Sequence, residues 1–345
     1  MIRGLLTCAA LACLLAVGWP VAGRAGGVPC APTVRATVPL PSQVDGLLAI
    51  GNADSILALS RAARLAGSQH AKQTLWVLGQ RDPRVPAVFS LPPSLTLPGL
   101  ALPDDGQPSV YLLLNQALWV LNPGRWRVEA RWPLDVQALG WPAALAAGGA
   151  GQIYVAGQPR DNRSWAAVVE ALVVRSGGPP RLRWRAHLGL THAGIWLGLA
   201  GLGLLAVYVP DANDVSGTMA LLDTRSGALR GSYAVPAPPM AVAMAQDRLY
   251  LDLAGTVQAR NLRTGQREGA IAGSSPLAVN SPRRLVALVE PRGIALANAT
   301  TLRPVAHVRL GTVTALAFSK DGTTLLIGSP SRVAWLTLGT CRAAP

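Results

Sequence analysis

The side chains best suited to chemistry lie scattered along this 345-residue chain. The four histidines share neither metal-ligand spacing nor a common motif; they are His70, His187, His192 and His307. A zinc site needs three or four convergent nitrogen or sulfur ligands, and neither HExxH nor CxxC occurs. The glycine-rich "GLAGLGLL" (198–205) does not precede a crossover helix, so it is not a phosphate loop. We therefore expect no catalytic residue set, no metal and no cofactor.

Two polar segments could contact a ligand or a partner. "DANDVSG" (211–217) brings three oxygen-bearing side chains into one short stretch, as calcium would require, but the glutamate that completes an EF-hand loop is missing. We therefore interpret it as a solvated loop. "QPRDNRSW" (158–165) occupies the corresponding place one structural unit earlier, so both loops are expected on the same face. The candidate binding residues in the two loops are Arg160, Asp161, Asn162, Asp211, Asn213 and Asp214.

Arginine alternates with apolar residues in two further segments, "GRWRVEARW" (124–132) and "RLRWRAH" (181–187). In a strand, alternate residues point to opposite sides. The residues expected to face outward are Arg125, Arg127, Arg131, Arg181, Arg183 and Arg185. Those expected to face inward are Trp126, Val128, Trp132, Leu182 and Trp184. The charges would keep outermost strands from pairing edge to edge; a basic surface for an anionic polymer is the second interpretation.

The first residues have the order of a secretory signal. Arg3 precedes 13 mostly apolar residues, and the small residues Gly23 and Ala25 follow. The apolar stretch is short for a membrane span. We predict a signal peptide over residues 1–25, with an uncleaved membrane anchor as the alternative. The mature chain, 26–345, would then be secreted or extracytoplasmic.

Removal of that segment leaves two cysteines, Cys30 and Cys341. In an exported chain, a lone pair of cysteines predicts a disulfide, with two free thiols as the alternative. Such a bond would join the two ends of the mature chain, so it requires those ends to meet in space.

Internal repetition decides the fold prediction. The chain is 50% hydrophobic and 14% charged, which excludes disorder, and its 36 glycines and 28 prolines favour many short strands. Gly217 and Thr218 coincide with Gly255 and Thr256 at a shift of 38 residues. Each copy joins two strands through a polar turn residue, namely Asn122, Asp223, Asn261, Asn298 or Thr337. Four-stranded units of about 40 residues predict the blades of a β-propeller.

Two segments carry a resemblance to known propellers. "GLGLLAVYVPDANDVSGTMALLDTRSGALRGSY" (201–233) resembles a blade of the secreted propellers of the YncE and cytochrome-d1 type. "VTALAFSKDGTTLLIGSPSRVAWLTLG" (313–339) resembles a WD40-type blade, with Trp335 near the place of the signature tryptophan. The resemblance covers about residues 95–341. It implies the fold and says little about function.

We therefore expect an all-β protein, a single β-propeller of seven four-stranded blades. The blades are expected at about 41–94, 95–136, 137–190, 191–237, 238–273, 274–311 and 312–340. The last unit has only three strands, and a strand at 33–40 would complete it and close the ring. A helix from Ala53 to Gln69, capped by Asp54, is the alternative. It would leave six blades with a helical insert.

The sequence favours a non-catalytic, extracytoplasmic binding scaffold that presents loops on one ring face to a protein partner. The first alternative is a propeller enzyme of the lactonase or quinoprotein kind, although acidic residues do not recur at channel-facing positions. The second is a binder of an anionic polymer, a cell surface or a membrane surface, because 31 Lys and Arg stand against 17 Asp and Glu. We expect no nucleic-acid partner.

Overall fold

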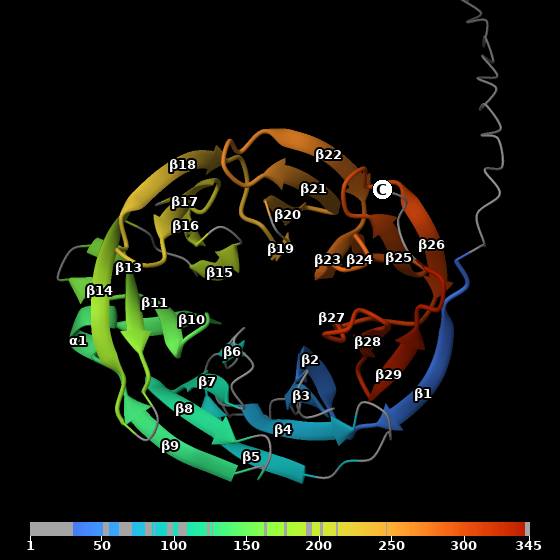
Figure 1. Ribbon diagram of the computed structural model, residues 1–345, viewed down its shortest axis with the longest axis horizontal. Coiled ribbons are helices and arrows are strands. Elements are labelled where there is room, and N and C mark those ends of the chain that lie inside the picture. Colours follow the sequence, from blue (N-terminus) through green and yellow to red (C-terminus); the bar gives the residue numbers. More distant parts are fainter. Residues whose placement is uncertain are drawn as a thin grey trace, which may run out of the picture.

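Short apolar segments separated by tight turns form seven antiparallel sheets, and the sheets are arranged in a ring (Figure 1). Each sheet is one blade, with four main strands that we call a to d from the ring centre outward. The chain is therefore a seven-bladed β-propeller, as predicted. The computed structural model describes residues 30–50, 55–61, 71–79, 85, 87–94, 99–102, 109–122, 125, 127–161, 164–175, 178–190, 195–200, 203–211, 213–245 and 247–341. The predicted signal peptide, 1–25, lies outside them.

The first four blades follow one another in chain order. Blade 1 has β2 (Gln43–Ile50), β3 (Ser55–Arg61), β4 (Ala71–Gly79) and β5 (Ala87–Ser94). Blade 2 has β6 (Gly99–Ala101), β7 (Val110–Leu114), β8 (Ala117–Asn122) and β9 (Arg127–Pro133). Blade 3 has β10 (Trp141–Ala147), β11 (Gln152–Gln158), β13 (Ser164–Val173) and β14 (Arg181–Leu190). Blade 4 has β15 (Trp196–Ala200), β16 (Leu204–Pro210), β17 (Gly217–Asp223) and β18 (Leu229–Val235).

Blades 5 and 6 also follow in chain order, whereas blade 7 combines strands from the two ends of the described chain. Blade 5 has β19 (Ala241–Ala245), β20 (Arg248–Leu253), β21 (Thr256–Asn261) and β22 (Arg267–Ala272). Blade 6 has β23 (Ser274–Asn280), β24 (Leu285–Glu290), β25 (Gly293–Asn298) and β26 (Pro304–Arg309). Blade 7 has β27 (Ala315–Phe318), β28 (Thr324–Gly328), β29 (Arg332–Thr337) and, as its d strand, β1 (Thr33–Pro39). Among described residues, the helix is α1 (Val136–Leu139), and none is long and apolar enough to cross a membrane.

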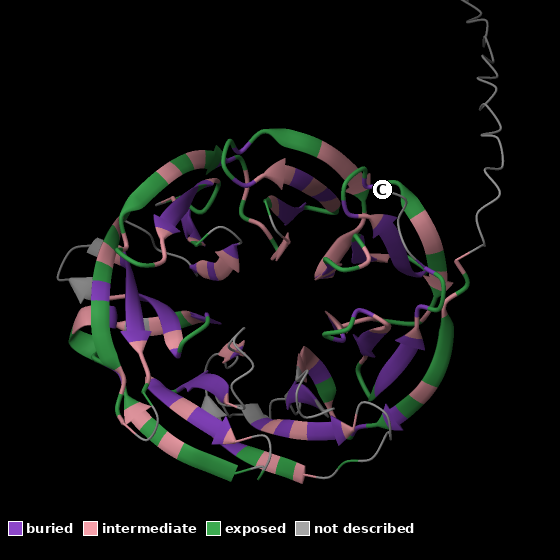
Figure 2. Ribbon diagram, in the orientation of Figure 1, coloured by how far each residue is buried: buried purple, intermediate pink, exposed green. Residues whose placement is uncertain are grey.

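The core consists of apolar clusters between neighbouring blades, one for each of the seven interfaces. Between blades 3 and 4, for example, Tyr154 and Val169 belong to the same cluster as Val207 and Leu222. Figure 2 shows the result: the middle strands are mostly buried, whereas exposed residues recur along the outermost strands. Since each blade depends on both neighbours, burial is complete only when the ring is closed.

Strand β3 shows why one blade could be mistaken for a helical insert. Ile56 and Ala58 face the cluster shared with blade 7, whereas Leu57 and Leu59 face the cluster shared with blade 2. A strand buried on both faces is a continuous apolar run, which periodicity alone does not distinguish from a buried helix. The alternative of a helix within residues 53–69 is therefore wrong where the structure describes that segment.

The predicted turn residues hold the connections between strands c and d. The Asp223 carboxylate accepts hydrogen bonds from the backbone N–H groups of Arg225 and Ser226, both at 3.0 Å. Gly227 then turns with φ +73°, and a Cβ there would lie 2.6 Å from the Trp184 ring of the preceding blade. The paired backbone bonds recur at Asn261 and Asn298. The repeat therefore fixes both the turn and the contact between blades.

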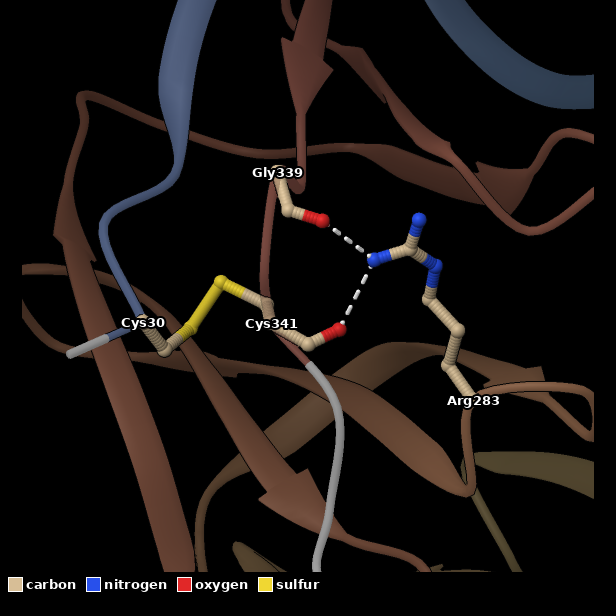
Figure 3. Close-up of a disulfide and its surroundings, with 4 residues drawn as sticks. All are labelled: Cys30, Arg283, Gly339 and Cys341. Carbon is tan, nitrogen blue, oxygen red and sulfur yellow. Dashed lines mark hydrogen bonds between the residues drawn. A yellow bond between two sulfur atoms is a disulfide. The ribbon is translucent and has the colours of Figure 1, made fainter. Parts of the chain in front are cut away.

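Ring closure is made by segments from opposite ends of the chain. Strand β1 pairs antiparallel with β29 and completes blade 7. Directly before β1, Cys30 forms a disulfide with Cys341, with the two Cα atoms 4.5 Å apart. The Arg283 guanidinium of blade 6 donates to the carbonyl oxygens of Gly339 and Cys341 at 2.7 and 2.9 Å (Figure 3). The predicted closing strand and cysteine pair are thus confirmed.

We predict that Cys30→Ser, Cys341→Ser and the double variant each lower the free energy of unfolding by about 2–5 kcal/mol, because the bond constrains the unfolded chain. Urea unfolding under non-reducing conditions measures the loss. Arg283→Ala removes the hydrogen bonds to Gly339 and Cys341 but leaves the disulfide intact, and it should lower the free energy of unfolding by about 1 kcal/mol. Equal stability of the wild type and the double cysteine variant would contradict the role given to the bond.

Candidate functional site

The strand order places the connections on two opposite faces of the ring. Connections between strands b and c, and between d and the next a, share one face, which we call the b–c face. Connections between a and b, and between c and d, share the other, the a–b face. Residues 158–165 connect β11 to β13, and residues 211–216 connect β16 to β17. The two predicted binding loops are therefore equivalent connections of adjacent blades on the b–c face.

In the second loop, Asp211 organises its own backbone. Its carboxylate accepts from the N–H groups of Asn213 at 3.1 Å and Val215 at 3.2 Å, and from the Ser216 hydroxyl. The Ser216 hydrogen bond, followed by those backbone bonds, holds the pKa of Asp211 below its ordinary value of 3.8. Asn213 and Asp214 are exposed. Among described residues no three His, Cys, Asp or Glu side chains gather as metal ligands. The loop thus presents Asn213 and Asp214, with Asp211 as their support.

The first loop is a small hairpin. The short strand β12 (Arg160–Asp161) pairs with the start of β13, with Arg160 opposite Trp165 and Asp161 opposite Ser164. Asn162 lies outside the described residues. The hairpin extends blade 3 on the b–c face, where the Asp211 loop of blade 4 also lies.

The two arginine-rich strands, β9 and β14, are outermost as predicted, but the alternation within them is partly wrong. Each has a register shift against its c strand, so two residues occupy the space of one. The shift leaves Val128 41% and Leu182 51% exposed, although the alternation placed both inward. Trp184 is buried and Trp132 partly buried, as predicted, and Trp126 lies outside the described residues. A bulge cannot be read from alternating residue types.

The six arginines have different surroundings. Arg185 donates through Nε to Glu170 on the adjacent strand at 2.7 Å, and the Glu170 side chain is only 4% exposed. Arg131 lies over the Trp119 ring, 5.1 Å from its centroid. Exposed arginines without either arrangement are Arg125, Arg127, Arg181 and Arg183. Sequence reasoning missed Glu170, yet a single acid inside the apolar run "AAVVEALVV" already requires a cationic partner.

Another missed residue is Asp252, which joins blades 5 and 6. Its side chain is buried, and its carboxylate accepts from the N–H groups of Ser275 at 2.6 Å and Gly255 at 3.2 Å. Ser275 belongs to the a strand of the next blade, so the carboxylate fixes that strand where it leaves the d–a connection. Nothing in the surrounding "LYLDLAG" marks this position as different from an exposed turn acid.

The b–c face carries a groove of about 320 Å³ between blades 6 and 7. Val34 of β1 lines one wall, and Leu310 and Val313 of the connection between β26 and β27 line another. Ile327 contributes further apolar surface, and the exposed Ser331 stands at the b–c turn of blade 7. The groove exists because β1 completes the last blade: without that strand, one wall would be missing.

No protein-family model matches this sequence, and no curated protein is significantly similar to it. The structure supports the resemblance to known propellers at the level of the seven-bladed fold. Functional inference therefore depends on the surfaces of this ring and their chemistry.

We predict that Asp211→Asn makes thermal stability less dependent on acid. Because folding lowers the pKa of Asp211, its contribution is complete above the ordinary value of 3.8 and is lost as the pH falls further. The wild type should therefore have a higher melting temperature than the variant at pH 6, and this difference should shrink below about pH 4. Asp214→Asn, which removes a charge from the same loop but no bond to Ser216, is the matched control. A difference in melting temperature that does not change with pH would refute the role given to the Asp211 carboxylate.

We also predict that Arg185→Ala lowers the free energy of unfolding by about 2–3 kcal/mol, because it leaves the buried Glu170 carboxylate unpaired. Arg183→Ala, on the same strand and exposed, should change it by at most about 0.5 kcal/mol. Urea denaturation of both variants makes the comparison. Equal effects would show that the Arg185–Glu170 pair does not support the strand.

Proposed function

We propose that this protein is a non-catalytic binding scaffold that works outside the cytoplasm and presents the b–c face to a protein partner. The observation that carries the proposal is the apolar groove between blades 6 and 7 on the face where the two polar loops also lie. The Cys30–Cys341 disulfide suggests an oxidising, extracytoplasmic environment.

The groove favours a protein over a charged polymer as its occupant. Its lining combines aliphatic side chains with the hydroxyls of Thr37, Thr312, Ser329 and Ser331. Among the described residues that line it, Arg332 is the one charged side chain. Such a surface suits an apolar side chain with neighbouring backbone hydrogen bonds, the usual chemistry of a protein anchor residue. The loops of blades 3 and 4 would add polar contacts to other blades on the same face.

The closed ring makes such a platform rigid. Each blade packs on both neighbours, and the groove walls come from β1, β29 and the β26–β27 connection. The disulfide joins the segments next to β1 and β29, and Leu310 and Val313 of the connection pack against the apolar cluster between blades 6 and 7. A preformed groove reduces the entropy lost on binding. The proposed partner would meet a surface that is already in its binding conformation.

A second candidate rests on the outer strands. The exposed Arg127, Arg181 and Arg183 flank the exposed Val128 and Leu182, a combination of cationic and aliphatic groups that suits an anionic membrane or polymer surface. Binding of this kind weakens strongly between low and moderate salt, whereas an apolar groove contact does not.

Site-specific photo-cross-linking tests the main proposal. We predict that a photoreactive residue at Ser331, on the b–c face, captures a distinct protein in the native envelope, and that the same residue at Thr264, on the a–b face, does not. Thr37→Trp, at an exposed position of the groove lining, should obstruct the groove and reduce the capture about tenfold without lowering the melting temperature. Equal capture from both faces, or capture unaffected by Thr37→Trp, would contradict the proposal. Salt-sensitive retention on heparin, lost in an Arg181→Ala, Arg183→Ala variant, would favour the second candidate.

A further inference from the structure

One main-chain hydrogen bond recurs on the a–b face of five consecutive blades. In each, the N–H of the first residue after strand c donates to the carbonyl of the last residue before strand b. The distances lie between 2.7 and 2.9 Å. The accepting residues, from blade 3 to blade 7, are Gly151, Gly203, Asp247, Arg284 and Thr323. These five positions are therefore equivalent in this main-chain hydrogen bond, which does not depend on the side chain.

Arg284 is an unexpected residue at this position. The equivalent Gly151 and Gly203 have φ values of +70° and +71°, and Arg284 adopts φ +54°. Left-handed backbone is unfavourable for a residue with a Cβ, and glycine avoids that cost. Backbone strain of this kind concentrates at functional sites. The turn itself would be better served by glycine, so the guanidinium needs another explanation.

Asp247 and Arg284 line one cavity between blades 5 and 6. The cavity has a volume of about 280 Å³, and Ser281 and Thr300 add hydroxyl groups to its lining. Both charged residues are exposed, and neither side chain forms an ion pair with any residue that the structure describes. The corresponding turn positions of adjacent blades thus place two opposite charges, not paired with any described residue, in the lining of one cavity.

The remaining polar groups of the cavity are already engaged. The Tyr250 hydroxyl donates to the Ala299 carbonyl at 2.6 Å. Arg248 forms an ion pair with Glu268 at 2.7 Å and donates to the same carbonyl at 3.3 Å. Burial raises the pKa of Tyr250 to about 12, so this phenol stays a donor. Among the lining residues that the structure describes, Asp247, Arg284 and the two hydroxyls are left to recognise a ligand.

We propose that this cavity binds a small zwitterion of the amino-acid type, with its carboxylate at Arg284 and its ammonium at Asp247. A simple anion would be repelled by Asp247 and a simple cation by Arg284, so the two charges together select a ligand that carries both. A volume of about 280 Å³ lies at the small end for ligand pockets, as such a molecule requires. The site is on the face opposite the proposed protein-binding groove, and it is independent of that groove.

Calorimetric titration of the purified, disulfide-bonded protein with the L-amino acids tests the proposal. At least one is expected to bind saturably. Its N-acetyl form, which lacks the ammonium, and its methyl ester, which lacks the carboxylate, should each bind about tenfold more weakly or not at all. Absence of saturable binding by every amino acid would overturn the proposal, as would equal binding of the N-acetyl form or a preference for a sugar acid.

Substitutions at the two equivalent positions supply the structural control. Arg284→Gly restores the residue found in blades 3 and 4, so the melting temperature should stay the same or rise while binding falls at least about tenfold. Asp247→Asn should reduce binding similarly and leave the fold intact. Arg292→Ala, an exposed arginine in a turn on the b–c face, should change neither property. Wild-type binding by Arg284→Gly or by Asp247→Asn would overturn the assignment.

Discussion

The whole ring depends on the pairing of β1 with β29. Without it, blade 7 would lack its d strand, and the apolar faces of blades 1 and 7 would have no fixed relation to one another. The cluster between those blades buries Val38, Val44, Ile56 and Trp335, which come from both ends of the sequence. Pairing of β1 with β29 therefore completes both the hydrogen bonding of the sheet edge and the burial of apolar side chains. The disulfide and the Arg283 hydrogen bonds stabilise this pairing.

The blades share backbone and turn hydrogen bonds but differ in their exposed side chains, so the fold and ligand recognition depend on different residues. The bonds of Asp223, Asn261 and Asn298 to their own turns recur in blades 4 to 6, and the main-chain bond between turns recurs in blades 3 to 7. Residues that those bonds do not use are free to differ from blade to blade. The groove on one face and the charged cavity on the other are two such differences between blades that share one architecture.

The fold was predictable because its turn chemistry repeats at a nearly constant interval and its last unit is one strand short. The surfaces were predictable only in part. The bulges that expose Val128 and Leu182 are set by pairing with another strand, which residue alternation does not contain. The meeting of Asp247 with Arg284 requires the register of two blades, and each residue alone resembles an ordinary turn charge. Glu170, by contrast, was visible as an acid in an apolar run.

Because the N-terminal strand β1 completes the last blade, the order of synthesis constrains the order of folding. During synthesis, β1 emerges first, yet its hydrogen-bonding neighbour β29 is made about 300 residues later, so the strand must wait unpaired until the rest of the chain exists. Contacts between such distant segments form slowly because a long loop must close first. A strand that waits unpaired presents free backbone N–H and C=O groups, so premature pairing of β1 with another sheet edge is the hazard that this order of synthesis creates.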